Sequence, residues 1–428
     1  MFNKKIKILY DATFIAENIN PKSRTGIFFV AYNVLKQMLK NKNLEIDLYC
    51  QYNLYSYLQQ VIKELFPDEN FKIITNLHNN NLGLRYHELD QKKQKYKQAK
   101  KHIKKFITSL SLSIIKRSFW VSELLLKLNI SRFLKYDAFF SPMYKVPDFL
   151  YLYKNIKKFV VLYDIVPIIY PQYFPDYNHH WHKYLMDSIN NDTWYFSISE
   201  YTRQDFIKYC PKMDKNKNIV TLLACDEKFK LVDNLKIKMT KQKYGIPQDK
   251  KYVFSLCTLE PRKNLIRTVK TFIEFIKKNN IQDLVFVLGG GHWQIFIDEL
   301  NKEINNLGDF QDKILKIGYV DDEDLPALYS GAEWFVYTSQ YEGFGLPPLE
   351  AMSCGCPVIT SNNSSLPEVV GDAGIMIDWD SDEQHVEAYE KYYYDNDFRN
   401  QMAQKGLERS KLFSWEKCAN QIIEVMTK

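Results

Sequence analysis

The sequence is poor in features that mark several protein classes. Glycine and proline supply only 15 residues each in a chain of 428, which excludes collagenous and low-complexity proteins. The seven cysteines form no C-x-x-C pair, so zinc-ribbon and thioredoxin-like sites are excluded and a reducing compartment is favoured. No stretch reaches the roughly 18 consecutive apolar residues of a membrane span, and no apolar leader precedes the strand-like run at 6–10. We therefore expect a cytoplasmic protein.

Strand-like runs alternate with helix-length segments along the whole chain, which is typical of parallel α/β sheets. With 428 residues, 46% of them hydrophobic, the chain is long enough for two or three domains. The lysine-rich, weakly patterned stretch 228–251 separates two series of runs, and we interpret it as the domain boundary. The first series is 6–10, 44–49, 71–74, 138–140, 159–163, 194–198 and 219–223; the second is 252–256, 284–288, 314–317, 334–337, 358–360 and 375–377.

These two series predict an α/β protein with two doubly wound, Rossmann-like domains that face each other across a cleft. We assign 1–235 to an N-terminal domain, 236–405 to a C-terminal domain and 406–428 to a closing helix. Open parallel sheets bind ligands beyond the carboxyl ends of their strands. The cleft is therefore where we expect the chemistry.

Positive charge is concentrated in one part of the chain. The net charge is +7, and 92–117 contains ten Lys or Arg and no Asp or Glu. This basic run leads into an apolar, aromatic-bearing stretch, so that 91–128 suits an anionic membrane surface. A solvated helical face is the simpler alternative. Nucleic acid is a weaker partner, because no zinc-finger, basic-zipper or RRM-like signature accompanies the charge.

The most specific segment is 341–352, Y-E-G-F-G-L-P-P-L-E-A-M, which follows a buried-type strand. It indicates a strand, a glycine loop and a helix start, with Pro348 at the first helical position and Glu350 in the first turn. The loop's N–H groups would point to where an anion lies. Taken alone, Glu350 is explained as an acidic residue that complements the helix dipole.

Glu342 and Glu350 could also be a glycosidase pair. On one helix, eight residues at about 1.5 Å each would separate their backbones by roughly 12 Å. Retaining hydrolases need about 5 Å between the two carboxyl groups. We therefore expect the two glutamates to hold two ends of one extended ligand.

Glu342 and Glu350, with seven intervening residues in E-G-F-G-L-P-P-L-E-A-M-S-C-G-C-P, closely resemble the E-x7-E motif of retaining GT-B glycosyltransferases of family GT4. The match continues along most of the chain outside 51–134 and implies the GT-B fold. Further segments in family order are 259–265, 318–325, 365–369 and 413–415, with weaker landmarks at 25–27, 163–167 and 199–202.

The resemblance implies that a nucleotide-diphosphate sugar binds mainly to the C-terminal domain. Glu350 would accept hydrogen bonds from the ribose, and Glu342 would contact hydroxyl groups of the donor sugar. Arg262 and Lys263 would neutralise the diphosphate, which suits a leaving group that gathers negative charge. Without a nearby anion, two cations at a helix start would be poorly placed.

Gly26 would let the helix that begins near Ile27 approach the diphosphate.

The sequence departs from the family pattern at two positions of the expected site. Tyr163 precedes Asp164 where many members have a histidine, so Asp164 is expected to orient the acceptor or the donor. Cys257 stands where some relatives have a phosphate-binding arginine. The backbone N–H groups implied to serve the sugar or the diphosphate are those of Phe344, Gly345 and Leu346.

Three other patterns could suggest a metal or dinucleotide site. The acidic run 321–324 is explained by a helix N-cap with an acidic first turn. The segment 179–182, H-H-W-H, lacks the i, i+4 zinc spacing and indicates a polar helical face. The triplet 289–291 lacks the G-x-G-x-x-G continuation. We therefore expect no metal and no cofactor besides the donor.

The resemblance implies a retaining, metal-independent hexosyltransferase. Its donor would be a nucleotide-diphosphate sugar, for which we favour GDP-mannose, and its acceptor a glycan or lipid-linked glycan of a surface polysaccharide. The enzyme would lie in the cytoplasm, with peripheral contact to the inner face of the membrane. Alternatives are an inactive GT-B scaffold protein and a GT-B nucleotide-sugar epimerase.

Overall fold

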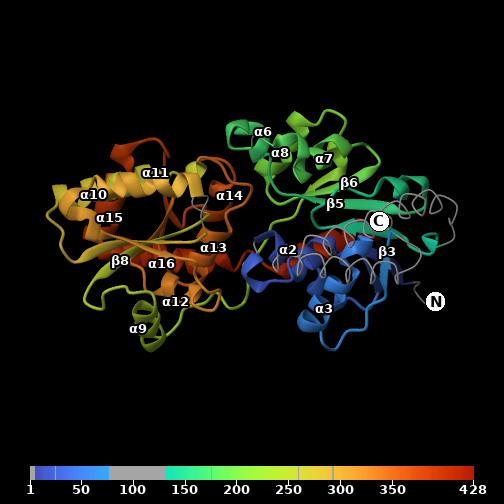
Figure 1. The fold of residues 1–428 in the computed structure, drawn as a ribbon, viewed down its shortest axis with the longest axis horizontal. Helices are drawn as coiled ribbons and strands as arrows, with labels where there is room; N and C mark the ends of the chain where they lie inside the picture. The colour runs from blue at the N-terminus through green and yellow to red at the C-terminus, as the bar shows by residue number, and fades with distance from the viewer. Residues whose placement is uncertain (1–4, 25, 77–131, 175, 259, 292–293) are drawn as a thin grey trace, which may run out of the picture.

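The computed structural model describes residues 5–24, 26–76, 132–174, 176–258, 260–291 and 294–428. Figure 1 shows two lobes side by side, the N-terminal one in blue and green and the C-terminal one in yellow and orange. The basic segment 91–128 lies outside the described residues, so its contact with a membrane stays a prediction.

The N-terminal lobe is built on a parallel sheet of order β3-β2-β1-β4-β5-β6-β7. Its strands are β1 (Ile6–Asp11), β2 (Leu44–Cys50), β3 (Ile73–Thr75), β4 (Ala138–Ser141), β5 (Lys157–Leu162), β6 (Thr193–Ser197) and β7 (Asn218–Val220). The helices described in this lobe are α1 (Thr13–Glu17), α2 (Gly26–Leu39), α3 (Tyr55–Leu65), α6 (Val166–Ile169), α7 (Trp181–Ser188) and α8 (Glu200–Tyr209).

The C-terminal lobe is built on a second parallel sheet of order β10-β9-β8-β11-β12-β13. Its strands are β8 (Lys251–Leu256), β9 (Leu284–Gly289), β10 (Ile314–Gly318), β11 (Trp334–Tyr337), β12 (Val358–Ser361) and β13 (Gly374–Ile377). The remaining helices are α9 (Asn234–Lys243), α10 (Leu265–Lys278), α11 (Gln294–Asn305), α12 (Leu325–Ser330), α13 (Leu346–Ser353), α14 (Leu366–Val370), α15 (Asp382–Tyr394), α16 (Asn396–Ser410) and α17 (Trp415–Thr427).

The central strands form because they are apolar on both faces and can be buried between helices. All six residues of β9 and all four of β11 are buried. Around the second sheet, α10 and α15 pack together above it in Figure 1, and α16 packs on β12 and β13. Each large side chain buried in this way contributes about 1.5–3 kcal/mol.

Each of the thirteen predicted strands is present, and the doubly wound α/β prediction is confirmed. The weakly patterned stretch 228–251 was interpreted as the domain boundary, yet it contains the helix α9, which packs on α12. The pattern is weak because only Thr240 and Lys241 of α9 are buried. The predicted divisions after 235 and 405 fall inside α9 and α16, and the division into domains stays a prediction.

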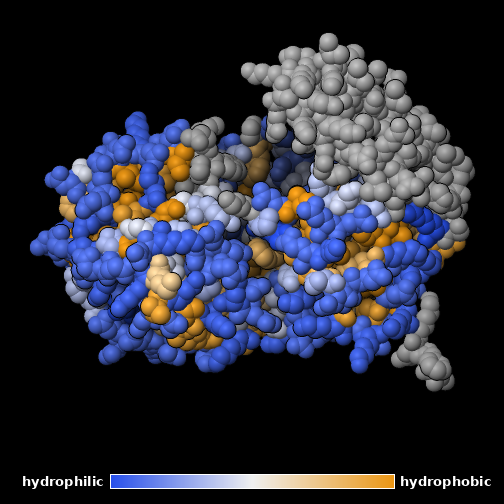
Figure 2. Space-filling view, turned by 60° about the horizontal axis from the view of Figure 1, so that its bottom comes forward, coloured by the Kyte–Doolittle hydropathy of each residue, from blue (hydrophilic) through white to orange (hydrophobic). Residues whose placement is uncertain are grey.

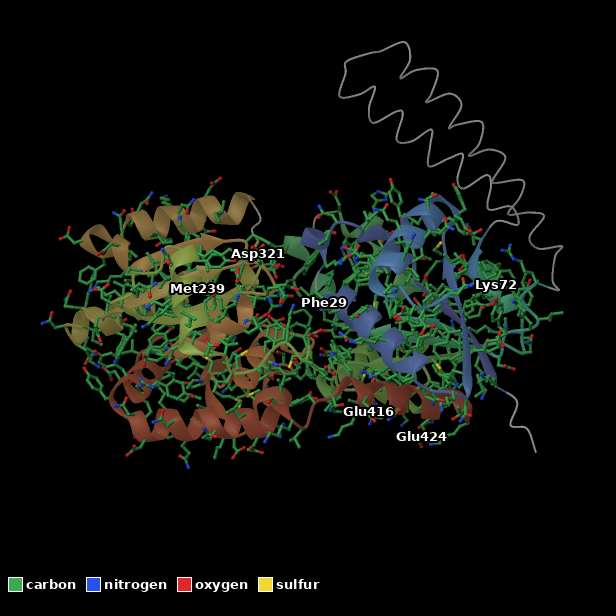
Figure 3. The ribbon with its side chains drawn as sticks, turned by 90° about the horizontal axis from the view of Figure 1, so that it is seen from below. Phe29, Lys72, Met239, Asp321, Glu416 and Glu424 are labelled. Atoms are coloured by element: carbon green, nitrogen blue, oxygen red, sulfur yellow. The ribbon has the colours of Figure 1, made fainter. Side chains whose placement is uncertain are left out.

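The closing helix is α17, which begins at Trp415 and packs on α2 of the N-terminal lobe. The chain therefore leaves the C-terminal lobe after α16 and crosses back. Figure 3 shows α17, marked by Glu416 and Glu424, along the N-terminal lobe, and Phe29 at the boundary between the lobes.

Across the described ranges, every helix is too short or too polar to cross a membrane. The face seen in Figure 2 is mainly hydrophilic, with apolar side chains in separate patches. Large exposed apolar side chains include those of Leu231, Leu235 and Met239, each at least 60% exposed.

Replacing Ile422 should weaken the attachment of α17. This side chain is 1% exposed, so Ile422→Ala is expected to lower the free energy of unfolding by about 2–5 kcal/mol. Urea unfolding followed by circular dichroism measures the change. Leu235→Ala, at a side chain that is 69% exposed, is the control and should change stability by less than about 0.5 kcal/mol. Equal losses in the two variants would contradict the assignment of α17 to the core.

Candidate active site

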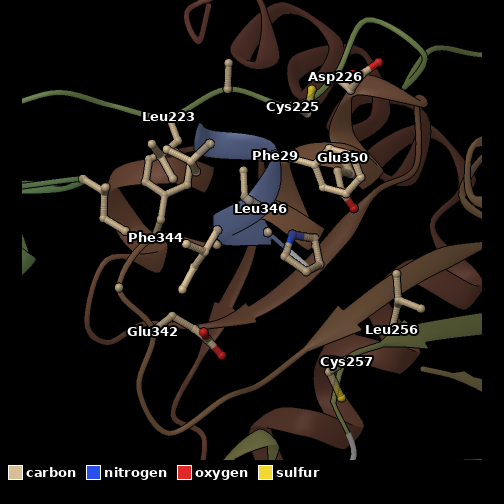
Figure 4. A pocket seen from close by; sticks show the side chains of 18 of the residues that line it. Phe29, Leu223, Cys225, Asp226, Leu256, Cys257, Glu342, Phe344, Leu346 and Glu350 are labelled. Atoms are coloured by element: carbon tan, nitrogen blue, oxygen red, sulfur yellow. The ribbon is translucent and has the colours of Figure 1, made fainter. Parts of the chain in front are cut away.

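The loops that follow the strands of both sheets enclose a cavity of about 530 Å³. Figure 4 shows Glu342 and Glu350 on opposite sides of the Leu346 side chain within it. Every residue that the sequence singled out for the site lines this one cavity. They are Gly26, Asp164, Arg262, Lys263, Glu342, Phe344, Gly345, Leu346 and Glu350.

The glycine loop between β11 and α13 differs from the prediction in one detail. Gly345, with φ of 123°, precedes the helix, so α13 begins at Leu346 and Pro348 is its third residue, not its first. Glu350 is consequently the fifth residue and lies beyond the first turn. The reason is the positive φ of Gly345, a conformation that glycine adopts without strain and that lets the helix start earlier.

The early helix start leaves few amide donors at this turn. Proline has no N–H, and Leu349 N–H already donates to the carbonyl of Gly345. Within the described part of the chain, no partner is recorded for the N–H groups of Phe344, Gly345 and Leu346. These three amides are therefore available to an anion or a sugar hydroxyl in the cavity.

Arg262 and Lys263 form a buried cluster with two glutamates. Glu342 Oε1 lies 2.5 Å from Lys263 Nζ and 3.1 Å from Arg262 Nη1, and Glu260 Oε1 lies 2.5 Å from Arg262 Nη2. Each of the four side chains is at most 12% exposed. The two cations occupy the 3-10 turn 261–263 before α10, where two protein carboxylates neutralise them. The anion that the sequence required is thus present within the chain itself.

The cluster fixes the charge of Glu342. Burial by itself would raise the pKa of this carboxyl, but Arg262 and Lys263 outweigh burial and lower the pKa to about 2. Lys263 Nζ also donates to the Tyr337 hydroxyl over 2.7 Å. Glu342 is therefore an anion at every physiological pH.

Glu350 is in the opposite situation. Burial raises its pKa to about 7, although it accepts a hydrogen bond from the Tyr329 hydroxyl over 3.0 Å. Asp322 raises the pKa further and Lys228 lowers it. The two glutamates of one cavity thus differ in pKa by about five units, because only Glu342 has cations in contact with it.

Asp164 lies on the N-terminal side of the cavity, after β5. Its carboxylate accepts a hydrogen bond from Val166 N–H over 3.0 Å, and its carbonyl accepts one from His182 Nε2 over 2.8 Å. His182 was expected on a polar helical face, but it is 2% exposed. The expectation failed because His182 lies on the inner side of α7, where its other ring nitrogen contacts the Tyr177 hydroxyl.

Several cavity residues were not recognised from the sequence. Lys228 and Asp322 form an ion pair of 2.8 Å next to Glu350, and the Lys228 ammonium lies 5.5 Å from the centre of the Phe29 ring. Lys228 belongs to no motif that would mark it, and Asp322 was explained as part of a helix cap.

Gly26 lies against Leu346, since a Cβ at position 26 would approach Leu346 Cδ1 to 3.3 Å.

The acidic run 321–324 has a different role from the one predicted. Asp324 occupies the N-cap position of α12 but makes no capping bond with its side chain. Its carboxylate instead pairs with Lys236 and Lys243 of α9 at 3.3 and 2.5 Å. Among the described residues, no group of three or more His, Cys, Asp or Glu side chains could hold a metal ion.

The raised pKa of Glu350 predicts a pH-dependent stability. Glu350 ionises near 4.5 in the unfolded chain and near 7 in the folded one, so the native state loses stability as pH rises through this window. Glu350→Gln should remove the loss. Its melting temperature, measured by calorimetry, should rise relative to wild type between pH 4.5 and 8. The control Glu416→Gln, at an exposed position of α17, should show no pH-dependent rise in melting temperature relative to wild type. If the difference between Glu350→Gln and wild type were the same at every pH, Glu350 would not have a raised pKa.

Comparison with known proteins identifies the family of this chain. The family model "Glycosyl transferases group 1" matches residues 236–409. The chain is 32% identical to O-antigen chain mannosyltransferase B of Escherichia coli over 283 residues, which are 66% of this chain and 73% of the relative. It is 29% identical to the serotype-specific mannosyltransferase WbdA of Escherichia coli over 64% of its own length, but spans only 33% of that protein.

The solved structure of Anabaena HepE in complex with UDP and glucose resembles this chain with a TM-score of 0.67 and 16% identity, over 99% of each chain. This likeness concerns the fold and confirms the predicted GT-B architecture. The resemblance seen in the E-x7-E segment is confirmed as well. The chain belongs to the glycosyl transferases group 1 family and has the GT-B fold.

Proposed function

We propose that this glycosyltransferase moves mannose from GDP-mannose to a glycan or lipid-linked glycan acceptor, with retention of configuration and without a metal. One observation carries the proposal: a single cavity holds an ionised Glu342 beside two cations at one end and Glu350 at the other. Two of its relatives are named mannosyltransferases, one of them of the O-antigen chain. A surface polysaccharide is therefore the proposed product.

The charge cluster suggests how the donor enters. With Glu260 and Glu342 against Arg262 and Lys263, the cluster is neutral overall. A diphosphate that approaches the two cations would compete with Glu342 for them. Glu342 would then turn its oxygens to the hydroxyl groups of the sugar. Charge-assisted hydrogen bonds from the cations and the three amides would stabilise the departing nucleotide.

Retention is attributed to attack from the face that the leaving group vacates, with the departing phosphate taking the acceptor proton. Such a step needs accurate positioning more than a protein base. Both ring nitrogens of His182 already have partners, so it is not poised as a base. We assign Asp164, on the facing lobe, to orienting the acceptor or the donor.

The end of the cavity that contains Glu350 supports guanine as the base of the nucleotide. Guanine presents N–H donors that suit a carboxylate and the acceptors O6 and N7 that suit a cation. Asp322 and Lys228 offer this pair of groups 2.8 Å apart, beside Glu350, the proposed ribose ligand. Uracil lacks the donor array of guanine, so the pair would discriminate between the two nucleotides.

A scaffold protein without turnover and a nucleotide-sugar epimerase are the alternatives. The intact cluster of Glu342, Arg262 and Lys263 argues against an inactive scaffold, because buried charges that have no use are costly to keep. The family match favours transfer over epimerisation. A cytoplasmic enzyme with peripheral membrane contact through 91–128 fits a lipid-linked acceptor.

Glu342→Gln should reduce transfer from GDP-mannose by about 100-fold or more, because it removes an anionic contact to the donor sugar at the reacting centre. Product formation is measured by mass spectrometry. The dissociation constant of GDP is the second readout and should not rise, because the glutamine no longer competes as an anion for Arg262 and Lys263. Glutamine is the informative replacement, because its amide oxygen still accepts hydrogen bonds from the buried cations. Alanine would leave the cations without this acceptor, at a cost of about 3–5 kcal/mol.

Glu260→Gln is the matched control, since Glu260 belongs to the same cluster but does not line the cavity. It should destabilise the protein as Glu342→Gln does and reduce transfer far less. Wild-type transfer in Glu342→Gln would reject the role of this residue.

Asp322→Asn should weaken GDP binding about tenfold, since one base contact contributes about 1–3 kcal/mol. UDP binding, measured by the same calorimetric titration, should change less than about twofold. Glu323→Gln alters the next residue, which does not line the cavity, and should affect neither nucleotide. If wild-type protein binds UDP more tightly than GDP, the proposed base is wrong.

A further inference from the structure

The start of α8, which has no role in the chemistry above, meets the glycine loop of the other lobe. Ser199 and Thr202, at the start of α8, direct their hydroxyl groups at the carbonyl of Gly343 in the glycine loop. The oxygen–oxygen distances are 2.8 Å from Ser199 and 3.0 Å from Thr202. Both side chains are fully buried. These two hydrogen bonds join the N-terminal lobe to the residue that follows Glu342.

Further contacts reinforce the same junction. Glu368 of α14 accepts hydrogen bonds from the N–H groups of Glu200 and Tyr201, at 2.8 and 2.7 Å, and so caps α8 from the other lobe. The Tyr341 hydroxyl donates to Asp205 of α8 over 2.6 Å. Both residues that flank Glu342 are therefore bound to α8, Tyr341 through its side chain and Gly343 through its backbone.

The junction also reaches the segment that carries Asp164. Thr202 Oγ1 lies 2.9 Å from the carbonyl oxygen of Tyr163 as well as 3.0 Å from that of Gly343. A Cβ at position 343 would lie only 2.2 Å from the Tyr163 oxygen. The backbones on either side of the cavity are thus in direct contact, and one hydroxyl lies between their carbonyl groups.

The glycine loop is also held by two serine side chains of its own lobe. Ser365 Oγ lies 2.9 Å from the carbonyl of Glu342 and 2.7 Å from that of Phe344, and Ser364 Oγ accepts the Glu342 N–H over 3.0 Å. The carbonyl of Gly343 is the exception, since its hydroxyl donors come from the other lobe. Separation of the lobes would remove both donors from a carbonyl adjacent to Glu342.

We propose that Thr202, together with Ser199, is a positioning residue that places Glu342 for transfer only when the two lobes are closed. The effect on transfer rests on the proposed function, whereas the effect on the loop does not. Thr202 acts through the Gly343 carbonyl and touches no substrate. Assembly of the reacting centre would in this way depend on closure of the enzyme.

Thr202→Val tests the proposal, because valine keeps the shape of threonine and lacks the hydroxyl. We expect kcat for transfer from GDP-mannose to fall about tenfold, because the variant lacks the one hydroxyl hydrogen that the buried carbonyl groups of Tyr163 and Gly343 share. The dissociation constant of GDP should stay within about twofold. Thr202→Ser, which keeps the hydroxyl, should recover kcat to within about threefold of wild type.

Thr271→Val is the matched control. Thr271 is 1% exposed, and its hydroxyl bonds within α10 to the carbonyl of Arg267 over 2.9 Å, so the loss of this hydroxyl should leave kcat unchanged. Hydrogen exchange of the loop 341–345, followed by mass spectrometry, supplies a readout that needs no activity. Exchange should become faster in Thr202→Val and not in Thr202→Ser or Thr271→Val.

The outcomes separate this inference from the proposed function. Faster loop exchange in Thr202→Val alone supports the inference even if wild-type protein transfers nothing from GDP-mannose, in which case only the proposed function fails. Unchanged exchange and unchanged kcat in Thr202→Val would overturn it. An equal loss in Thr271→Val, or no recovery in Thr202→Ser, would also overturn it, since the effect would then be general destabilisation.

Discussion

The site depends on one interaction, the buried contact of Glu342 with Lys263 and Arg262. Taking charges out of water is expensive, and a buried ion persists only where partners compensate it. Glu260 and Glu342 compensate the two cations, so the protein can keep strong positive groups in its interior without a ligand. Under the proposed function, an arriving diphosphate would exchange partners with Glu342 and would not need to create the cationic site. The same contact keeps Glu342 ionised, whereas burial raises the pKa of Glu350, which accepts a hydrogen bond from the Tyr329 hydroxyl, to about 7.

Much of the fold could be predicted from the sequence because buried parallel strands are continuous apolar runs. β8 and β9 are examples, and their ends were predicted within one residue. α9 could not be found in this way. Most of its surface is exposed, two of its lysines pair with Asp324 far along the chain, and the helix therefore has no apolar stripe.

The candidate site also contains features that could be predicted from the sequence and others that could not. Residues that belong to a sequence motif, such as Glu342 and Glu350, were identified with their neighbours, and all of them line one cavity. Features that depend on the tertiary structure were not: the neutralisation of Arg262 by Glu260, the burial of His182, and the pairing of Lys228 with Asp322. The start of α13 was misplaced because the conformation of Gly345 is not evident from residue type alone.

The return of the chain into the N-terminal lobe has a mechanical consequence. The polypeptide passes between the lobes once between β7 and α9 and again between α16 and α17. Two attachment points leave a rigid body one easy motion, rotation about the line that joins them. Sliding and twisting would stretch one tether or the other. Trp415, at the second crossing, also lines the cavity, so the pivot of any such rotation lies beside the cavity, and the greatest displacement would occur at the rim farthest from this pivot.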